Sequence, residues 1–188
     1  MQSPATVSFD DELLILVDEN DQIVGHQDKA SSHDDQGILH RAFSVFIFNE
    51  AGEVLLQQRT KQKRLWPEIW ANTCCSHPRK NEETNAAANR RLLEEVGFET
   101  ELTFLYKFEY HATYQDKGSE HELCSVFVGI SNDTPQDNSN EIAQTRYLKP
   151  EEVDALLKEN PEDYSPWLHL EWAELRTTHW ATIQEMLA

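Results

Sequence analysis

Two pairs of charged side chains stand at helical spacing between positions 90 and 95 of this sequence. Arg91 and Glu95 are four residues apart, as are Arg90 and Glu94, so each pair shares one helix face. A carboxylate such as that of Glu95 is a hard ligand for a Mg²⁺ that bridges diphosphate oxygens, and the forked donors of Arg91 suit the same oxygens. The alternative is a surface helix stabilised by ion pairs.

The segment 76–98 resembles the Nudix box, G-x5-E-x7-R-E-U-x-E-E-x-G-U, in which U is a bulky apolar residue. Ser76 stands where the box has its glycine, and Arg91 stands where it has a glutamate. In a Nudix hydrolase that glutamate gathers metals and activates water, which a guanidinium cannot do. A guanidinium can instead anchor a diphosphate that is left whole. The residues in register with the box are Glu82, Arg90, Leu92, Glu94, Glu95, Gly97 and Phe98.

A cysteine lies immediately before this box. The positive environment at the mouth of an anion-binding helix favours the thiolate of a cysteine. Cys75 is therefore a candidate for a chemical role, with inert packing as the alternative that spacing alone leaves open. Its neighbour Cys74 points the other way along an expected strand, and we interpret it as packing.

Two glutamates form a further cluster, because residues two apart on a strand project to one face. When two carboxylates lie so close together, either the pKa of one of them rises or the pair binds a cation. The alternative is that both lie on a solvated edge of an acidic protein. Three of the eight histidines favour the cation, since two of them flank the first core strand and the third lies at the start of the box. Imidazole ligands favour Zn²⁺ or Mn²⁺ over Mg²⁺. The expected five-ligand set is His33, His40, His77, Glu120 and Glu122.

Composition limits the class of protein. The chain has 188 residues, 39% apolar and 27% charged, which indicates one globular domain. Its first residues lack the basic start and apolar segment typical of a signal peptide, and no apolar run is near the ~20 residues of a membrane span. Three cysteines indicate a reducing cytoplasm rather than a disulfide framework. The net charge of −18 argues against nucleic acid. An anionic substrate would need a local positive patch, and Arg59, Lys61, Lys63 and Arg64 supply one.

Alternating apolar residues and turn residues predict the elements that must position these groups. Gly97 closes the first clear helix. Strands mixed with three helices predict an α+β fold, a layered sandwich with a mixed sheet, with a core at about 40–150 and an N-terminal hairpin extension in one domain over 1–188. The expected strands cover 12–17, 22–26, 41–48, 54–59, 69–74, 102–113, 122–130 and 142–148, and the expected helices cover 82–96, a segment opened by Pro150, and a segment from Ser165-Pro166 to the end.

Taken together, these residues resemble the type I isopentenyl diphosphate isomerases, over a region from about residue 29 to residue 167. The resemblance implies the Nudix-type α/β/α sandwich and a 1,3-allylic proton shift that interconverts isopentenyl and dimethylallyl diphosphate. The matching strings are Leu39-His40-Arg41-Ala42-Phe43-Ser44, Trp66-Pro67-x-x-Trp70-x-Asn72, Cys75-x-His77-Pro78, Arg90-Arg91-x-x-x-Glu95-x-Gly97, Tyr110-x-Ala112, Glu120-x-Glu122-x-Cys124 and Ser165-Pro166-Trp167.

The resemblance also implies a role for each matching residue. Cys75 and Glu122 would flank the hydrocarbon end of the substrate, with Tyr110 assisting Glu122, and which of the pair is the acid stays open. Glu95 and the Cys75 carbonyl would hold a Mg²⁺ on the diphosphate. The five His and Glu residues named above match the family's second metal site, whose metal stays open between Zn²⁺, Mn²⁺ and Mg²⁺. The diphosphate-binding cations implied are Lys29, Arg59, Lys63 and Arg91.

Elementary chemistry agrees with the allylic proton shift that the resemblance implies. Protonation of an isolated alkene gives a tertiary carbocation that water would trap, so the site must be dry and must present an electron-rich face. Trp167, in a rigid setting at a helix start, suits this purpose. The rival hypotheses are a Nudix hydrolase of a nucleoside diphosphate derivative and a non-catalytic Nudix-like binding module. We expect a monomer, with a dimer as the alternative, and a small-molecule diphosphate as the partner.

Overall fold

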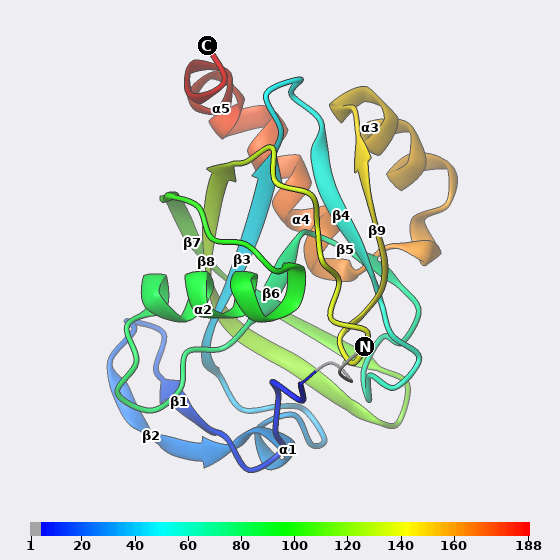
Figure 1. The fold of residues 1–188 in the computed structure, drawn as a ribbon. Helices are drawn as coiled ribbons and strands as arrows, with labels where there is room; N and C mark the ends of the chain where they lie inside the picture. The colour runs from blue at the N-terminus through cyan, green and yellow to red at the C-terminus, as the bar shows by residue number, and fades with distance from the viewer. Residues whose placement is uncertain (1–4) are drawn as a thin grey trace.

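The computed structural model describes residues 5–188 and contains nine strands, which form one mixed sheet (Figure 1). The strands are β1 (Leu13–Val17), β2 (Ile23–Asp28), β3 (His40–Phe48), β4 (Val54–Arg59), β5 (Trp70–Ala71), β6 (Cys74–Ser76), β7 (Leu102–Tyr114), β8 (Gly118–Ile130) and β9 (Ile142–Leu148). The helices are α1 (Lys29–Ser32), α2 (Thr84–Val96), α3 (Pro150–Glu159), α4 (Pro166–Glu174) and α5 (Trp180–Met186), with a 3-10 turn at Pro161–Asp163 and a π-helical turn at Leu175–His179.

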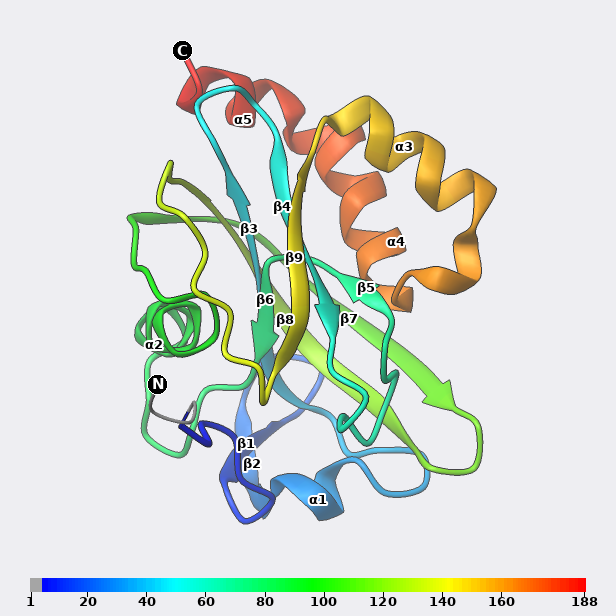
Figure 2. The same ribbon diagram turned by 45° about the vertical axis from the view of Figure 1, so that its right-hand side comes forward.

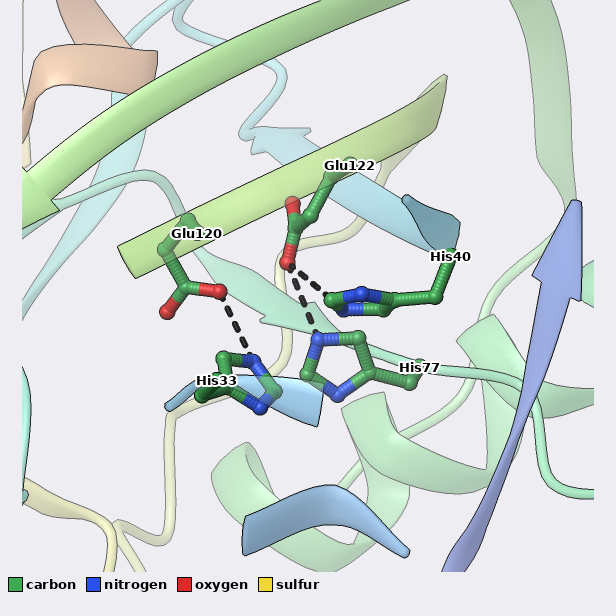
Figure 3. Close-up of side chains that lie close together, drawn as sticks. All are labelled: His33, His40, His77, Glu120 and Glu122. Atoms are coloured by element: carbon green, nitrogen blue, oxygen red, sulfur yellow. Dashed lines mark hydrogen bonds and ion pairs between the residues drawn. The ribbon is translucent and has the colours of Figure 1, made fainter. Parts of the chain in front are cut away.

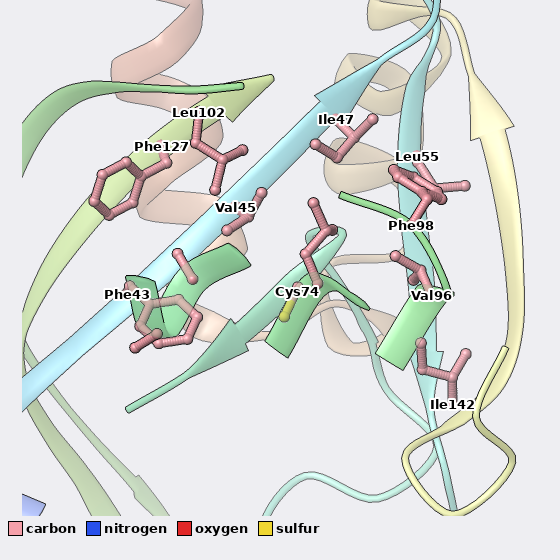
Figure 4. Close-up of a cluster of buried hydrophobic side chains, with 13 residues drawn as sticks. Phe43, Val45, Ile47, Leu55, Cys74, Val96, Phe98, Leu102, Phe127 and Ile142 are labelled. Atoms are coloured by element: carbon pink, nitrogen blue, oxygen red, sulfur yellow. The ribbon is translucent and has the colours of Figure 1, made fainter. Parts of the chain in front are cut away.

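Helices cover both faces of the sheet, so the predicted sandwich is confirmed. Figure 2 shows α2 on one face and α3, α4 and α5 on the other. Both faces of strand β3 are apolar, because its side chains point alternately into the two layers that cover the sheet. Phe43, Val45 and Ile47 pack in the cluster beneath α2, which Figure 4 shows. Phe46 and Phe48 pack on the opposite face with residues of α3 and α4.

Strands β3 and β4 separate soon after their turn, and two side chains fill the gap. The register pairs them only at Phe48 and Val54. Thr73 Oγ1 accepts a hydrogen bond from the Ile47 amide at 2.9 Å and donates to the Leu55 carbonyl at 2.6 Å. The single strand expected at 69–74 is therefore two short strands, β5 and β6, because the Asn72–Thr73 step bonds through its side chains.

Helix α2 begins two residues later than the sequence predicts. Glu82 lies outside it, because its carboxylate accepts a hydrogen bond from the Arg79 amide at 2.8 Å and pairs with Arg90. The predicted C-terminus is confirmed, since Gly97 ends the helix with a left-handed φ of 84°. The predicted shared face of Arg91 and Glu95 is also confirmed, because the two side chains form an ion pair.

Two other elements differ from the sequence-based expectation. Helix α1 was not expected; the side chain of Asp28 caps it by accepting a hydrogen bond from the Ser31 amide at 2.9 Å. The expected continuous C-terminal helix is interrupted by the π-helical turn, where Thr177 Oγ1 donates to the Ala173 carbonyl at 2.8 Å. Within residues 5–188, none of the helices is both long and apolar enough to cross a membrane.

The β7–β8 hairpin is longer than predicted, because β8 starts at Gly118 and so includes both glutamates of the expected cluster. Gly118 has a φ of +140°, and a Cβ atom at this position would lie 2.1 Å from the carbonyl oxygen of His33. The amide of Ser119 donates to that same oxygen at 3.0 Å. The hairpin is therefore attached to the segment that carries His33, and only glycine permits this approach.

We predict that Gly118→Ala destabilises the protein. The clash with the His33 backbone and the disfavoured φ together should lower the free energy of unfolding by about 1–3 kcal/mol, measured by urea denaturation. The matched control is Gly25→Ala in β2, where a new Cβ would make only an ordinary contact, 3.9 Å from Leu16 Cδ1. Equal stability of the Gly118→Ala variant and the wild type would contradict the assignment of this close approach.

Candidate active site

One cavity of about 420 Å³ opens where α1, β6, β8 and the start of α4 meet. It is lined by cations at one end and by a thiol, aromatic rings and carboxylates elsewhere. Nearly all of the side chains that the sequence singled out reach it, although they come from distant parts of the chain. The lining residues among those predicted are Lys29, His33, Arg59, Lys63, Arg64, Cys75, His77, Arg91, Tyr110, Glu120, Glu122 and Trp167.

The predicted His/Glu set converges at the wall of this cavity (Figure 3). One ligand atom from each of the five residues lies within 4.8 Å of all the others. His33 Nδ1 and His40 Nδ1 each lie 2.6 Å from a backbone carbonyl oxygen, of Lys29 and Ile38 respectively. Donation to those carbonyls leaves each Nε2 lone pair free for the cluster. His40 Nε2 is buried without any hydrogen-bond partner, which is an arrangement that suits a metal ion.

The carboxylates of this cluster face the imidazoles, and Glu122 Oε1 also lies 3.8 Å from His40 Nε2. Glu120 Oε2 lies 2.8 Å from His33 Nε2, and Glu122 Oε1 lies 2.9 Å from His77 Nε2. Both glutamates point to the same side of β8, as residues two apart on a strand must. The donor set is thus three imidazole nitrogens and two carboxylate groups, which fits a divalent metal.

Burial sets the protonation state of the cluster. It lowers the pKa of His40 to about 4 and the pKa of His77 well below its usual range, so both rings are neutral at pH 7. Burial also raises the pKa of Glu122 well above its usual range, and the charge of Glu120 adds to this effect. For Glu120 itself, burial is outweighed by the neighbouring His33, and its pKa falls to about 2. The two carboxyl groups therefore titrate apart.

Cys75 and Glu122 lie on the two strands that flank β3. Cys75 is paired with Ser44 across the β3–β6 register, and Glu122 is paired with His40 across the β3–β8 register. Tyr110 Oη donates a hydrogen bond of 2.6 Å to Glu122 Oε2. Burial raises the pKa of the Cys75 thiol to about 12 and so opposes the thiolate that the sequence suggests, whereas the nearby Arg59 lowers this pKa and favours it.

An aromatic wall closes this end of the cavity. Trp167 is buried, and its Nε1 donates to Asn72 Oδ1 at 3.1 Å. The ring of Trp66 packs edge-on against it at 5.4 Å between centroids, and the guanidinium of Arg59 lies 5.4 Å from the Trp167 centroid. Arg59 is held in turn by the carbonyls of Leu65 and Trp66, at 2.9 and 3.0 Å.

The cationic end is built on α2 and the loop before β9. Arg91 is buried and pairs with Glu95, its Nε lying 3.1 Å from Glu95 Oε1. Arg91 Nη2 also lies 3.4 Å from Glu141 Oε2, and Lys63 forms an ion pair with the same carboxylate. Gln57 on β4 donates to the second oxygen of Glu95 at 3.3 Å. Two buried carboxylates thus hold two of the predicted cations in place.

Lys29 and Arg64 are held by other contacts than the Glu95 and Glu141 carboxylates. Lys29, the first residue of α1, contacts the hydroxyl of Ser8, and Arg91 Nη1 donates to the Val7 carbonyl at 2.6 Å. Arg64 donates to the carbonyls of Ala30 and Lys117, at 3.1 and 2.8 Å, and so holds loops together. Exposed Lys61, the fourth member of the expected patch, does not line the cavity.

The structure adds residues that the sequence reasoning did not single out. Glu141 followed a polar loop without any motif of its own, so its place beside Arg91 had no local signal. Asn72 stood in a string that matched the isomerases, but its bond to Trp167 depends on packing between distant segments. Cys74, by contrast, is fully buried in the cluster beneath α2, which confirms its interpretation as packing.

Comparisons with known proteins agree with this site. The NUDIX domain profile matches residues 38–170. The chain is 44% identical over 170 residues to "Isopentenyl-diphosphate Delta-isomerase 1" of Photorhabdus laumondii, covering 89% of this chain and 97% of that protein. It is 46% identical over 154 residues to "Isopentenyl-diphosphate Delta-isomerase" of Nocardia farcinica, covering 81% and 88% respectively.

Solved structures share the fold at low sequence identity. The crystal structure of DR0079 from Deinococcus radiodurans has a TM-score of 0.66 and 22% identity, covering 79% of this chain and 90% of that one. A MutT protein from Methanosarcina mazei has a TM-score of 0.59 and 18% identity, covering 72% and 91%. These two likenesses concern the fold alone, whereas the relatives at 44% and 46% identity identify the group within the family. The chain therefore belongs to the NUDIX family and, within it, to the isopentenyl-diphosphate Delta-isomerases.

Proposed function

We propose that this protein interconverts isopentenyl and dimethylallyl diphosphate by a 1,3-allylic proton shift. The observation that carries this proposal is that one cavity presents Cys75 and Glu122 together with the cations Lys29, Lys63 and Arg91. A diphosphate needs the cations, and proton transfer at carbon needs a positioned acid and base. The relatives named for this activity support the proposal.

The cationic end of the cavity binds the diphosphate. Lys29, Lys63 and Arg91 line this end, Arg59 reaches the cavity from the side of Trp167, and the forked donors of both arginines suit phosphate oxygens. Glu95 would hold a Mg²⁺ that neutralises part of the diphosphate charge. Because Arg91 replaces the water-activating glutamate of a hydrolase, this end anchors the diphosphate without splitting it.

The other end moves the protons. Glu122 Oε2 accepts the hydrogen bond of Tyr110 Oη, and we assign to Glu122, assisted by Tyr110, the donation of a proton to the terminal alkene carbon. Cys75 then accepts a proton from the neighbouring methylene, for which it must act as thiolate. Arg59 Nη1, 4.0 Å from Cys75 Sγ, is the group placed to stabilise that anion. The double bond shifts, and the number of protons on the substrate is unchanged.

The carbocation-like state between these two transfers requires a dry, electron-rich surface. The buried ring of Trp167 supplies it, in contact with Trp66 and at the same end as Cys75. A desolvated cation–π contact is worth about 2 kcal/mol, which corresponds to roughly thirtyfold in rate. Most of the acceleration must therefore come from the positioned acid and base.

The His/Glu cluster would hold one divalent metal, and its three imidazoles favour Zn²⁺ or Mn²⁺ over Mg²⁺. Such an ion would supply positive charge beside Glu122 and would fix that side chain. We place the protein in the cytoplasm, because the three cysteines are free.

The direct test is incubation of the protein with isopentenyl diphosphate and Mg²⁺ in deuterated water. We expect deuterium in dimethylallyl diphosphate and no release of phosphate. Phosphate released from nucleoside diphosphate derivatives, with no allylic isomer formed, would favour the hydrolase instead. A protein that binds isopentenyl diphosphate but forms neither product would favour the binding module.

We predict that Cys75→Ala and Glu122→Gln each reduce kcat by at least about a hundredfold, because a positioned acid or base contributes ~10²–10⁴-fold. The rate of label incorporation measures this, and circular dichroism checks that the fold is kept. Cys74→Ala is the matched control, because Cys74 faces the α2 layer and should leave kcat nearly unchanged. Turnover retained in either site variant would overturn the assigned roles.

We predict that Lys63→Gln raises the KM for isopentenyl diphosphate by about tenfold to a hundredfold. The loss of one charge-assisted hydrogen bond to phosphate is worth about 1.5–3 kcal/mol. Lys61→Gln is the control, since the exposed Lys61 lies two positions away and outside the cavity. A similar rise in KM for both variants would point to a diffuse effect of surface charge instead.

We predict that His40→Ala retains less metal than the wild type after dialysis, measured by elemental analysis, because it removes a buried nitrogen ligand. His26→Ala, in β2, is the control. Lowering the pH from 7 to 5 should release metal from the wild type. Burial lowers the pKa of His33, but Glu120 raises it by more, so the net shift is upward. As the pH falls, His33 therefore takes up a proton before His40 and His77 do and ceases to be a ligand. Equal metal content in wild type and His40→Ala would exclude this site.

A further inference from the structure

Helix α4 carries a buried acid to which the reaction described above assigns no role. Glu171 lies four residues, about one helical turn, after Trp167 and is fully buried. Its Oε1 atom lies 3.6 Å from the Sγ atom of Cys124, and its Oε2 atom has no hydrogen-bond partner. Within residues 5–188, it forms no ion pair with any basic side chain.

The partners of Glu171 lie on the site-facing side of the sheet. Cys124 Sγ is also 3.5 Å from Ser44 Oγ, so the thiol touches both groups. A thiol has one hydrogen and cannot donate to both, so at least one of the neighbours must donate. The β3–β6 register pairs Ser44 with Cys75, which places this contact chain directly beside the reacting thiol.

The surroundings require Glu171 to be neutral. An ionised carboxylate in an apolar site is expensive unless its oxygens are bonded or paired, and here one oxygen has no partner at all. Burial raises the pKa of Glu171 to about 8. The titratable groups that interact with it are also acids, and none supplies a compensating positive charge: Cys75 on β6, Tyr106 on β7, and Glu122 and Cys124 on β8.

We propose that Glu171, as a neutral carboxylic acid, is a positioning residue that joins helix α4 to strands β3 and β8 and so fixes Trp167 over the Cys75–Glu122 pair. The proposal rests on the isomerase function proposed above. Trp167 has one polar attachment of its own, from Nε1 to Asn72, near the start of the helix. Glu171 provides a second attachment one turn later, and the hydroxyl of Tyr106 donates to its backbone carbonyl at 3.4 Å.

Two attachments matter because the aromatic wall must keep its distance from the reacting carbons. Trp172 Nε1 joins α4 to α3 through Asp154 at 2.8 Å, but the contacts of Glu171 with Cys124 are what join this turn of α4 to the strands that carry the reacting groups. A displacement of ~1 Å in a reacting geometry reduces the rate by about a hundredfold. The diphosphate is held by other elements and would not sense this movement. Ionisation of Glu171 would also place a negative charge near Cys75 and Glu122, which raises the pKa of both.

The test compares Glu171→Gln and Glu171→Ala with the wild type. Glutamine keeps the shape, the hydrogen bonds and the neutrality, so we expect kcat within about threefold of the wild type at pH 7. We expect Glu171→Ala to lower kcat by about tenfold to a hundredfold, with KM and the affinity for inorganic pyrophosphate within about threefold. Above about pH 8 the wild type should lose activity more steeply than Glu171→Gln. Glu174→Ala, a half-exposed glutamate of the same helix, is the control and should match the wild type.

Thermal unfolding shows whether the alanine variant is folded, and the pH profile of Glu171→Gln decides the question if it is not. An unchanged kcat in folded Glu171→Ala would overturn the proposal, as would equal losses in binding of pyrophosphate and in turnover. Identical alkaline limbs for the wild type and Glu171→Gln would overturn it as well. Absence of isomerisation by the wild type would instead be a failure of the proposed function, and it is seen before any variant is measured.

Discussion

Strand β3 hydrogen-bonds to β6 along one edge and to β8 along the other, and its register with both strands determines which side chains can meet. Residues two apart on β3 face the same layer, so His40 and Ser44 share a face. Glu122 lies opposite His40 and Cys75 lies opposite Ser44. A shift of one residue in either register would turn the acid or the thiol into the α2 layer. The reactive pair thus depends on backbone pairing that hydrophobic burial on both faces enforces.

Buried charge at the cationic end is organised by long-range contacts. Arg91 comes from α2, Glu141 from the loop before β9, and Lys63 from the loop after β4. Ions buried in this way gain little net stability, because desolvation offsets their attraction. Their retention is better explained by binding, since cations held by carboxylates present fixed donors to an anion without first having to be ordered. The same network explains why an arginine at a position that carries a glutamate in hydrolases leaves the fold intact.

The sequence predicts those parts of the site that depend on the spacing of residues within one strand or one helix. Strand alternation separates Cys74 from Cys75 and brings Glu120 and Glu122 together, and helical spacing pairs Arg91 with Glu95. It cannot place Glu141 or Glu171, because their partners are distant in sequence and no motif surrounds them. It also does not give the pKa of Cys75, where burial opposes the thiolate that spacing suggests. Desolvation decides that pKa, and desolvation depends on the whole assembled cavity.

The two ends of the cavity impose opposite demands on water. A diphosphate is held by ion pairs and charge-assisted hydrogen bonds, which tolerate water, whereas a carbocation survives only where water is excluded. The chain separates these demands by element: the cations come from α1, α2 and loops, and the dry end comes from β6, β7, β8 and α4. A Nudix fold that kept its metal-gathering glutamate would bring an activated water to the diphosphate. On the proposed mechanism, the replacement of that residue by Arg91 and the closure of the far end by Trp167 turn the same scaffold from hydrolysis toward proton transfer at carbon.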